Sequence, residues 1–332
     1  MKNQSYLRSA IVGACVSSAI FIGIGKSCAQ ILPGSPTTLW TALLYGVSNP
    51  TIPDPSNDQQ TGSLESDIVG NTTHASLFTA FYDGGTPSLT DGQIAFRLRL
   101  AEEKNPPGFS GSAFVGLDAN GDGKLDLFLG VNNSGSADQI GIWKAGSGAN
   151  ISPNTTTLAN TPSFTYTETS TNYSWIQVTS ISDPSATSYD LDGGGGTDRF
   201  LSFVLPFADV VAAVNSVLTN GFNQNSVVAY VAATATQANS LNQDLNGVDG
   251  GVNSSSTWAS LGALTLPYSA SGIQVPEPAT GTFLILGATY MGLCRRRKRL
   301  PTNYRISTHG PNLVGLAPPS SETKRIPDHD HV

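Results

Sequence analysis

Short runs of alternating or continuously apolar residues, separated by turn residues, limit the fold of this 332-residue chain more than any other feature. The clearest run is Ile94–Leu100, where apolar and polar side chains alternate and put Arg97 and Arg99 on one face of a strand. Gly, Asn, Asp and Ser dominate the connecting segments, as in turns. Many short strands over residues 30–274 predict a mainly β fold, a single antiparallel β-sandwich or jelly-roll-like domain.

The predicted strands are spread over most of this body. They are Ile94–Leu100, Ser112–Leu117, Leu125–Val131, Gln139–Trp143, Ser163–Thr167, Tyr173–Thr179, Phe200–Leu205, Val227–Ala232 and Leu261–Leu266. One short helix is predicted at Phe207–Leu218, because Pro206 suits its start and Gly221 its end. Residues 48–67, rich in Pro, Asn, Asp and Ser, are predicted to form an irregular entry segment.

The charges divide the chain into an acidic body and two basic ends. Only 12% of the residues are charged, about half the usual one-quarter, which argues against a coiled coil or a helical bundle. Residues 30–275 contain six basic and 20 acidic residues, a formal charge of −14. Such a body repels phosphate backbones, so no nucleic-acid partner is expected, and it attracts divalent cations.

The three cysteines, Cys15, Cys28 and Cys294, lie near the two ends and leave the body without any. The body therefore has no disulfide, no cysteine-ligated zinc site and no cysteine nucleophile. Its hydrophobic core or a bound metal must stabilise it.

The N-terminal residues 1–29 are predicted to be a secretory signal peptide. Lys2 and Arg8 precede an apolar run at 10–25, and small residues follow it at Ser27-Cys28-Ala29. This arrangement predicts cleavage by signal peptidase before Gln30.

The C-terminal region has three parts in order: a Pro-Glu-Pro signature, an apolar run at 279–294 and a basic cluster at 295–299. As a helix the run would be about 24 Å long, a marginal span for a hydrocarbon core of about 30 Å. The basic cluster would remain cytoplasmic by the positive-inside rule. The candidate motif residues are Pro276, Glu277, Pro278, Arg295, Arg296 and Arg297.

This tripartite arrangement at 275–299 resembles the PEP-CTERM sorting signal, also catalogued as the ice-binding protein C-terminal domain. The resemblance implies export in a Gram-negative bacterium that makes exopolysaccharide, transient anchoring in the inner membrane and processing by an exosortase-type enzyme. It implies sorting only, with release to the cell surface or outside the cell, and it gives no evidence of ice binding. Residues 300–332 continue past the arginines where that family usually ends, and they are predicted to form a disordered cytoplasmic tail.

The strongest chemical motif in the body is the acidic loop 118–126, with the pattern D-x-N-x-D-G-x-x-D. It resembles the calcium loops of EF-hands and of FG-GAP-type repeats, although position 12 is Leu129 rather than Glu. The flanking runs look like strands, so an EF-hand helix pair is not expected, and the alternative is a polar hairpin turn. The candidate Ca²⁺ ligands are Asp118, Asn120, Asp122, Asp126 and the backbone carbonyl of Lys124.

Two other acidic loops are weaker candidates for a metal. One holds Asp190, Asp192 and Asp198 around a glycine run, where crowded carboxylates repel one another unless a cation neutralises them. The alternative for this loop is a solvated turn. The other candidate loop supplies a third set of ligands, which are Asp244, Asn246 and Asp249.

Catalytic patterns are sparse. His74 is the body's single histidine and has no nucleophile-elbow pattern nearby. The four glutamates of the body show no spacing that pairs two of them, as a glycosidase would need.

The sequence therefore predicts an exported, surface- or matrix-associated, non-enzymatic protein that binds Ca²⁺ structurally. The alternative is a carbohydrate-binding module for an extracellular polysaccharide, with tryptophan faces stacking on sugar rings. Trp258, after a Ser-rich loop, is the better candidate for an exposed ring, whereas Trp175 is expected to point inward. A glycoside hydrolase is the second alternative, which two carboxylates facing across a cleft would favour.

Overall fold

The computed structural model describes residues 30–45, 54–60, 63–85, 91–104, 108–135, 138–155, 157–219, 221–249 and 255–275. The chain divides into two units, Met1–Glu277 and Pro278–Val332. The predicted signal peptide at 1–29, apolar helix at 279–294, basic cluster at 295–299 and tail at 300–332 lie outside the described residues. Among the residues described, no helix has the length and apolar character needed to span a bilayer.

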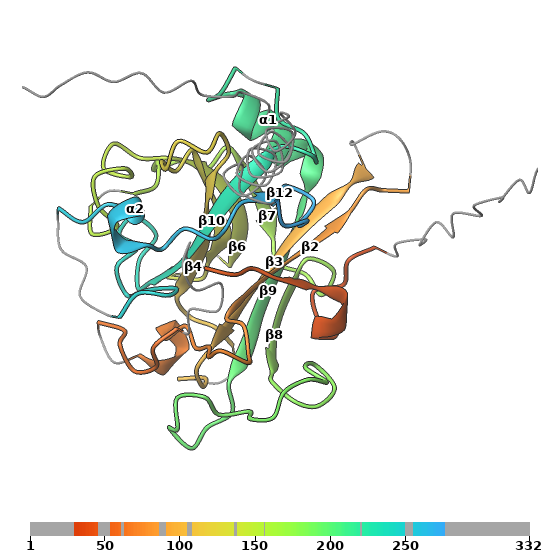
Figure 1. The fold of residues 1–332 in the computed structure, drawn as a ribbon, viewed down its shortest axis with the longest axis vertical. Helices are drawn as coiled ribbons and strands as arrows, with labels where there is room; N and C mark the ends of the chain where they lie inside the picture. Colours follow the sequence, from red (N-terminus) through yellow and green to blue (C-terminus); the bar gives the residue numbers. More distant parts are fainter. Residues whose placement is uncertain are drawn as a thin grey trace, which may run out of the picture. The chain divides into compact units, whose positions relative to one another are not determined.

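Two antiparallel sheets make up the body, in agreement with the predicted mainly β fold (Figure 1). The five-stranded sheet has the order β1-β2-β3-β9-β8, and the seven-stranded sheet has the order β11-β10-β4-β5-β6-β7, with β12 paired to β10. The strands are β1 (Thr41–Ala42), β2 (Leu77–Tyr82), β3 (Gln93–Leu100), β4 (Ser112–Asp118), β5 (Leu127–Asn132), β6 (Gln139–Lys144), β7 (Phe164–Thr167), β8 (Tyr173–Gln177), β9 (Arg199–Pro206), β10 (Val227–Ala235), β11 (Asp244–Leu245) and β12 (Tyr268–Ser269). Because β4 to β7 are neighbours in chain order, this part of the larger sheet is a meander rather than a jelly-roll crossing.

The main core lies between the two sheets. Leu98 and Phe203 contribute from the five-stranded sheet, and Leu117 and Leu129 from the seven-stranded sheet, all almost fully buried. The ring of Phe96 on β3 lies 5.2 Å from that of Tyr230 on β10, an edge-to-face contact across the core. The two sheets thus face each other as the layers of a sandwich.

The outer face of each sheet is also covered. Phe128 and Trp143 of the larger sheet form a second cluster with Trp258, from helix α2 (Trp258–Leu261). Phe78 and Phe200 of the smaller sheet form a third cluster with Trp40 and other residues of the loops. Seven of the eight residues of β3 are therefore buried, including both of its arginines.

Eight of the nine predicted strands coincide with β3 to β10. The predicted helix is α1 (Phe207–Asn215), which ends three residues earlier than expected. The predicted strand Leu261–Leu266 is wrong, because Thr257 and Ser260 form a capping box that starts α2 there and a left-handed Gly262 ends it. Two short 3₁₀ helices, η1 (Thr37–Leu39) and η2 (Leu64–Ser66), complete the elements described.

The first and last described segments pair with each other. The backbone N–H of Leu44 donates to the hydroxyl of Tyr268 at 2.9 Å, and the N–H of Leu266 donates to the carbonyl of Leu44 at 2.9 Å. Tyr45 forms an antiparallel bridge with Thr265. Residues from both ends of the body thus close the same part of the fold.

Candidate functional site

The loop between β4 and β5 holds the first predicted calcium motif, and its side chains bond to the loop's own backbone. The two carboxylate oxygens of Asp118 accept the N–H groups of Gly121 at 2.7 Å and Gly123 at 2.8 Å. Asp122 accepts the N–H of Lys124 at 3.0 Å. Both glycines have positive φ, which fits a tight turn.

The remaining candidates of this loop continue the pattern. Asn120 accepts the N–H of Asp122 at 2.9 Å, and Asp126 accepts the N–H of Ala119 at 2.9 Å. Burial raises the pKa of Asp126, and the charges of Asp118 and Asp122 add to this effect. The loop is not among the groups of described residues in which three carboxylate oxygens lie within 4.8 Å of one another. Calcium binding here stays a prediction.

The loop between β8 and β9 brings Asp190, Asp192 and Asp198 together. Each offers a carboxylate oxygen within 4.8 Å of the other two. We call this group the glycine-loop cluster. Asp190 also accepts the N–H groups of Gly193 at 2.7 Å and Gly195 at 3.0 Å, and both glycines have positive φ. The glycine run therefore permits the turn that brings the carboxylates together.

A fourth carboxylate borders this loop. A Cβ at Gly196 would overlap the carboxylate of Glu102, so that glycine is needed for the close approach. Burial raises the pKa of Asp192, and the carboxylates of Asp190 and Glu102 raise it further. Asp190 shares a side-chain hydrogen bond with Asp192, and this bond lowers the pKa of Asp190. The loop thus concentrates negative charge at one place.

Asp198 is the member of the glycine-loop cluster that has a basic partner, Arg99. Its carboxylate accepts from Nε of Arg99 at 2.7 Å and lies 2.6 Å from Nη2, and both side chains are fully buried. Burial raises the pKa of Asp198 to about 6, although Arg99 acts in the opposite direction. One charge of the cluster is therefore already balanced.

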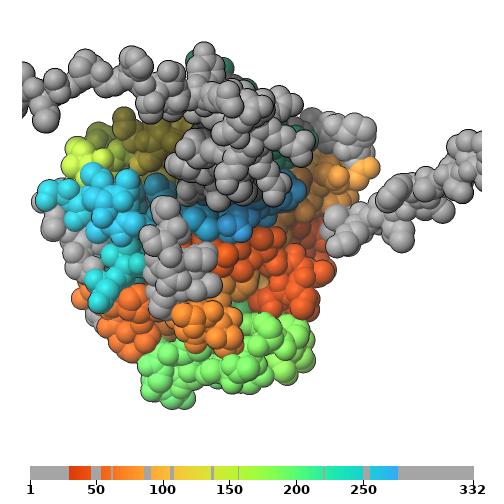
Figure 2. Space-filling model, viewed as in Figure 1, coloured from red at the N-terminus to blue at the C-terminus, as the bar shows by residue number. Residues whose placement is uncertain are grey.

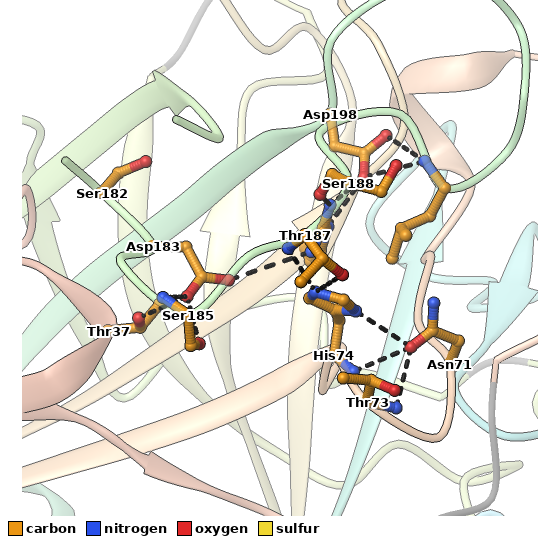
Figure 3. Close-up of polar contacts among 12 residues, drawn as sticks. Thr37, Asn71, Thr73, His74, Ser182, Asp183, Ser185, Thr187, Ser188 and Asp198 are labelled. Carbon is orange, nitrogen blue, oxygen red and sulfur yellow. Dashed lines mark hydrogen bonds and ion pairs between the residues drawn. The ribbon is translucent and has the colours of Figure 1, made fainter. Parts of the chain in front are cut away.

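His74 belongs to the same polar network, as Figure 3 shows. Its Nε2 accepts the backbone N–H of Thr187 at 3.0 Å, which assigns the proton to Nδ1, and Nδ1 lies 3.1 Å from the side-chain oxygen of Asn71. Burial lowers the pKa of His74, and the charge of Arg99 lowers it further. A neutral imidazole therefore links two loops by hydrogen bonds.

The third predicted loop separates in space. Asp249 is exposed, whereas Asp244 and Asn246 are buried. Asp244, at the start of β11, lies instead beside Asp58 and Asp67, with one carboxylate oxygen of each within 4.8 Å of the others. We call Asp58, Asp67 and Asp244 the inner cluster.

Asn57 joins the two clusters. Its backbone N–H donates to both carboxylate oxygens of Asp67, at 3.1 and 2.9 Å, and its side-chain amide donates to the backbone carbonyl of Asp192 at 3.1 Å. Asn57 has a φ of 65°, a left-handed conformation that Asn tolerates. Asp58 and Asp67 were not predicted as ligands, and the abundance of Asp in the 48–67 segment was the one available signal.

A groove of about 770 Å³ lies beside β7 and β8, which are edge strands of the two sheets. Its lining residues include Glu103, Glu168, Tyr173, Ser174, Trp175 and Arg199. Glu103 and Arg199 form an ion pair at 2.5 Å. Burial raises the pKa of Glu168 to about 7.

The expectations for the two tryptophans have different outcomes. Trp258 is buried, and its indole N–H donates to the carbonyl of Ala149 at 2.6 Å, so the expectation of an exposed ring is wrong. Trp175 is partly buried and packs against the main core, in agreement with the expected inward orientation. Its ring centroid lies 5.4 Å from that of Phe109, and its partly exposed side also lines the groove.

Comparison with known proteins concerns the end of the chain. The family model of the PEP-CTERM protein-sorting motif matches residues 274–298 and confirms the resemblance of the tail. No curated protein and no solved structure matches the chain. Interpretation of the body therefore rests on its own geometry.

Proposed function

We propose that this chain with a PEP-CTERM motif is anchored in the inner membrane, processed by an exosortase-type enzyme, and released to the cell surface or outside the cell, with calcium as a structural ion in its body. The glycine-loop cluster carries the calcium proposal, because Asp190, Asp192 and Asp198 converge within 4.8 Å. The body has a non-enzymatic role in this proposal. The non-enzymatic role is supported by His74, because both of its ring nitrogens are engaged in hydrogen bonds.

The chemistry of the loop favours calcium over other metals. Its donors are carboxylate oxygens, which suit hard cations rather than zinc or copper. Glycine-rich backbone and a bordering Glu102 allow the variable, higher coordination number of Ca²⁺, whereas Mg²⁺ demands a stricter octahedron. A bound cation also relieves the repulsion among the carboxylates.

Thermal melts of the purified full-length chain test this proposal. With a Kd of about 10⁻⁴ M and roughly 10 mM free Ca²⁺, binding adds about 2.7 kcal/mol of stability. At about 2–4 °C per kcal/mol, the Tm rises by about 5–10 °C over the protein in EDTA. Mg²⁺ at equal ionic strength has a smaller effect.

The matched variants separate binding from charge screening. Asp190→Asn with Asp192→Asn lowers the calcium-induced shift, whereas Asp249→Asn, at an exposed position, leaves it unchanged. Equal shifts in all three proteins, or equal shifts with Ca²⁺ and Mg²⁺, would show that the loop is only a turn.

A saccharide-binding role is the second candidate function, supported by the β7–β8 groove. Trp175 Nε1, Ser174 Oγ, Arg199 Nε and Glu168 Oε1 are buried without a hydrogen-bond partner in the described part of the chain. Donors and acceptors beside aromatic rings suit sugar hydroxyls, which both donate and accept.

Affinity electrophoresis in gels that contain an acidic or a neutral polysaccharide tests this role. Retardation that Glu168→Gln and Trp175→Ala each reduce supports the groove, and the buried Trp143→Phe serves as a control. Glu103 and Glu168 line the same groove, so reducing-sugar release is measured in parallel for the glycosidase alternative. Equal mobility in gels with and without polysaccharide would exclude the role for those polymers.

A further inference from the structure

The inner cluster joins parts of the chain that are distant in sequence. Asp67 follows η2, Asp58 lies in the preceding loop, and Asp244 begins β11. Asp67 is fully buried, Asp244 is 5% exposed and Asp58 is half-buried. Their carboxylate oxygens lie within 4.8 Å of one another, a spacing that one cation could bridge.

Asp54 adds a fourth carboxylate to this place. It is 2% exposed, and one of its oxygens accepts the N–H of Gly247. Its second oxygen, Oδ2, is buried and has no hydrogen-bond partner among the described residues. Burial raises the pKa of Asp54, and the charges of Asp244, Asp58 and Asp67 raise it further, so its carboxylate lies within electrostatic reach of the inner cluster.

Backbone N–H groups satisfy only part of this negative charge. Ile68 donates to Asp244 at 2.5 Å, and Asn57 donates to Asp67. The ion pairs of the described chain join Arg99 and Arg199 to other acids, and none involves Asp54, Asp67 or Asp244. Buried like charges of this kind take up protons or a cation.

Three segments meet on the face of the molecule that Figure 2 shows. Orange residues of the 54–76 region adjoin cyan residues near 244–249 on one side and green residues near 183–198 on the other. Hydrogen bonds from Gly247 to Asp54 and from Asn57 to Asp192 confirm both junctions. A cation here would hold the 54–67 segment against the larger sheet.

We propose that Asp54, Asp58, Asp67 and Asp244 form a buried calcium site that fastens the 54–67 segment to β11. The carboxylate-only donor set selects a hard divalent cation, and three converging carboxylates with that of Asp54 nearby suit the larger, more flexible shell of Ca²⁺. The proposal rests on the calcium function above only for the choice of cation, because it uses different residues from the glycine-loop cluster.

Calcium titration of the full-length chain by isothermal calorimetry, after removal of metal with EDTA, tests the proposal. The inner variant is Asp67→Asn with Asp244→Asn, and the loop variant is Asp190→Asn with Asp192→Asn. Asn keeps the size and one acceptor oxygen while it removes the charge, so the apo inner variant should fold at least as well as the parent in EDTA. Circular dichroism melts in EDTA check this for every protein.

We expect the inner variant to bind one calcium ion fewer per chain than the parent, or to bind that ion at least tenfold more weakly. It should still bind the other ion, which the loop variant loses. Calcium should also protect the 54–67 segment of the parent from limited proteolysis, and not that of the inner variant. An inner variant that folds in EDTA and binds calcium like the parent would falsify the inner site. If the loop variant binds as many calcium ions as the parent and the inner variant binds fewer, the glycine loop binds no calcium. That result would refute the function proposed for the glycine loop and leave the inner site supported.

A further variant covers the case in which the inner double substitution does not fold. Asp54→Asn alone leaves the other three carboxylates and should weaken calcium binding at least tenfold without loss of the EDTA melt. Unchanged calcium affinity in this folded variant would also overturn the four-carboxylate site. Mg²⁺ in place of Ca²⁺ should give at least tenfold weaker binding, and equal affinities would contradict the choice of cation.

Discussion

The guanidinium of Arg97 lies 4.2 Å from the ring centroid of Trp40, which joins the middle of β3 to the first described segment of the chain. Its other ring neighbour is Phe200, at 4.9 Å. Nη2 donates to the carbonyls of Pro33 at 2.6 Å and Ser35 at 2.7 Å. This fully buried cation therefore holds residues 33–40 on the outer face of the five-stranded sheet.

Arg97→Lys should destabilise the protein by about 2–4 kcal/mol, because one ammonium cannot keep both the paired carbonyl contacts and the stacking on Trp40. Urea denaturation measures the change, with the exposed Lys124→Arg as the control. A loss below about 0.5 kcal/mol would mean that the contacts of Arg97 add little.

Gly130→Ala should lower stability by about 1–3 kcal/mol or more, because β5 has no room for a methyl group there. A Cβ would overlap the carbonyl oxygen of Ala113 and lie 2.6 Å from the ring of Phe114. Gly34→Ala is the control, since no atom lies within 4 Å of its added Cβ. Similar urea midpoints for both variants would contradict the tight strand packing.

Stability in EDTA should fall as the pH rises from about 4.5 to about 7, because burial raises the pKa of Glu168 from 4.5 to about 7. In that range the folded chain holds a proton that the unfolded chain has released, so a higher pH favours unfolding. Asp67 and Asp198, whose pKa values burial raises to about 6, act in the same direction. Glu168→Gln should flatten the part of the curve between pH 6 and 7 in a series of urea melts. A curve parallel to that of the parent would refute this assignment to Glu168.

Asp122→Ala should lower the calcium-induced rise in Tm if the 118–126 loop binds the ion, since position 5 of such a loop supplies a direct carboxylate. The side chain is exposed, so the melt in EDTA should change by less than about 0.5 kcal/mol. A shift identical to that of the parent identifies the loop as a hairpin turn.

Mature protein from a host with an exosortase should begin near Gln30, where the signal-peptide pattern predicts cleavage. It should also lack the basic cluster at 295–299, because the sorting motif matches residues 274–298. Intact-mass spectrometry of the secreted material measures both ends. Secreted protein that retains the arginines would show that the motif is not processed.

Strands with one polar face, or with clear flanking turns, could be predicted from the sequence. β2 could not, because LFTAFY has no alternation. Its first four residues are buried, including the polar Thr79, so both faces of the strand are covered and no alternation of exposed and buried residues marks it. The burial of Trp258 could not be predicted for a related reason. Segments distant in the sequence cover the outer faces of the sheets, and the local sequence pattern does not show which segments pack together.

The candidate sites also differ in whether local sequence or packing between distant segments brings their residues together. Asp190, Asp192 and Asp198 belong to one loop, so their spacing was enough to group them. Asp58 and Asp67 are grouped with Asp244 by the packing of a loop segment against β11, and nothing in the local sequence relates residues so far apart. The search for metal motifs by spacing therefore finds single-loop sites and misses sites assembled from several segments.

The pairing of residues 44–45 with 265–268 makes closure of the body depend on a segment near each of its two ends. Because synthesis begins at the N-terminus, residues 44–45 lack these partners until the chain has been made as far as Tyr268, so this contact forms late. The N–H of Val275 still donates to the carbonyl of Pro267 at 2.9 Å, and the Pro-Glu-Pro signature begins at the next residue. Loss of the chain beyond that signature would leave these closing contacts in place.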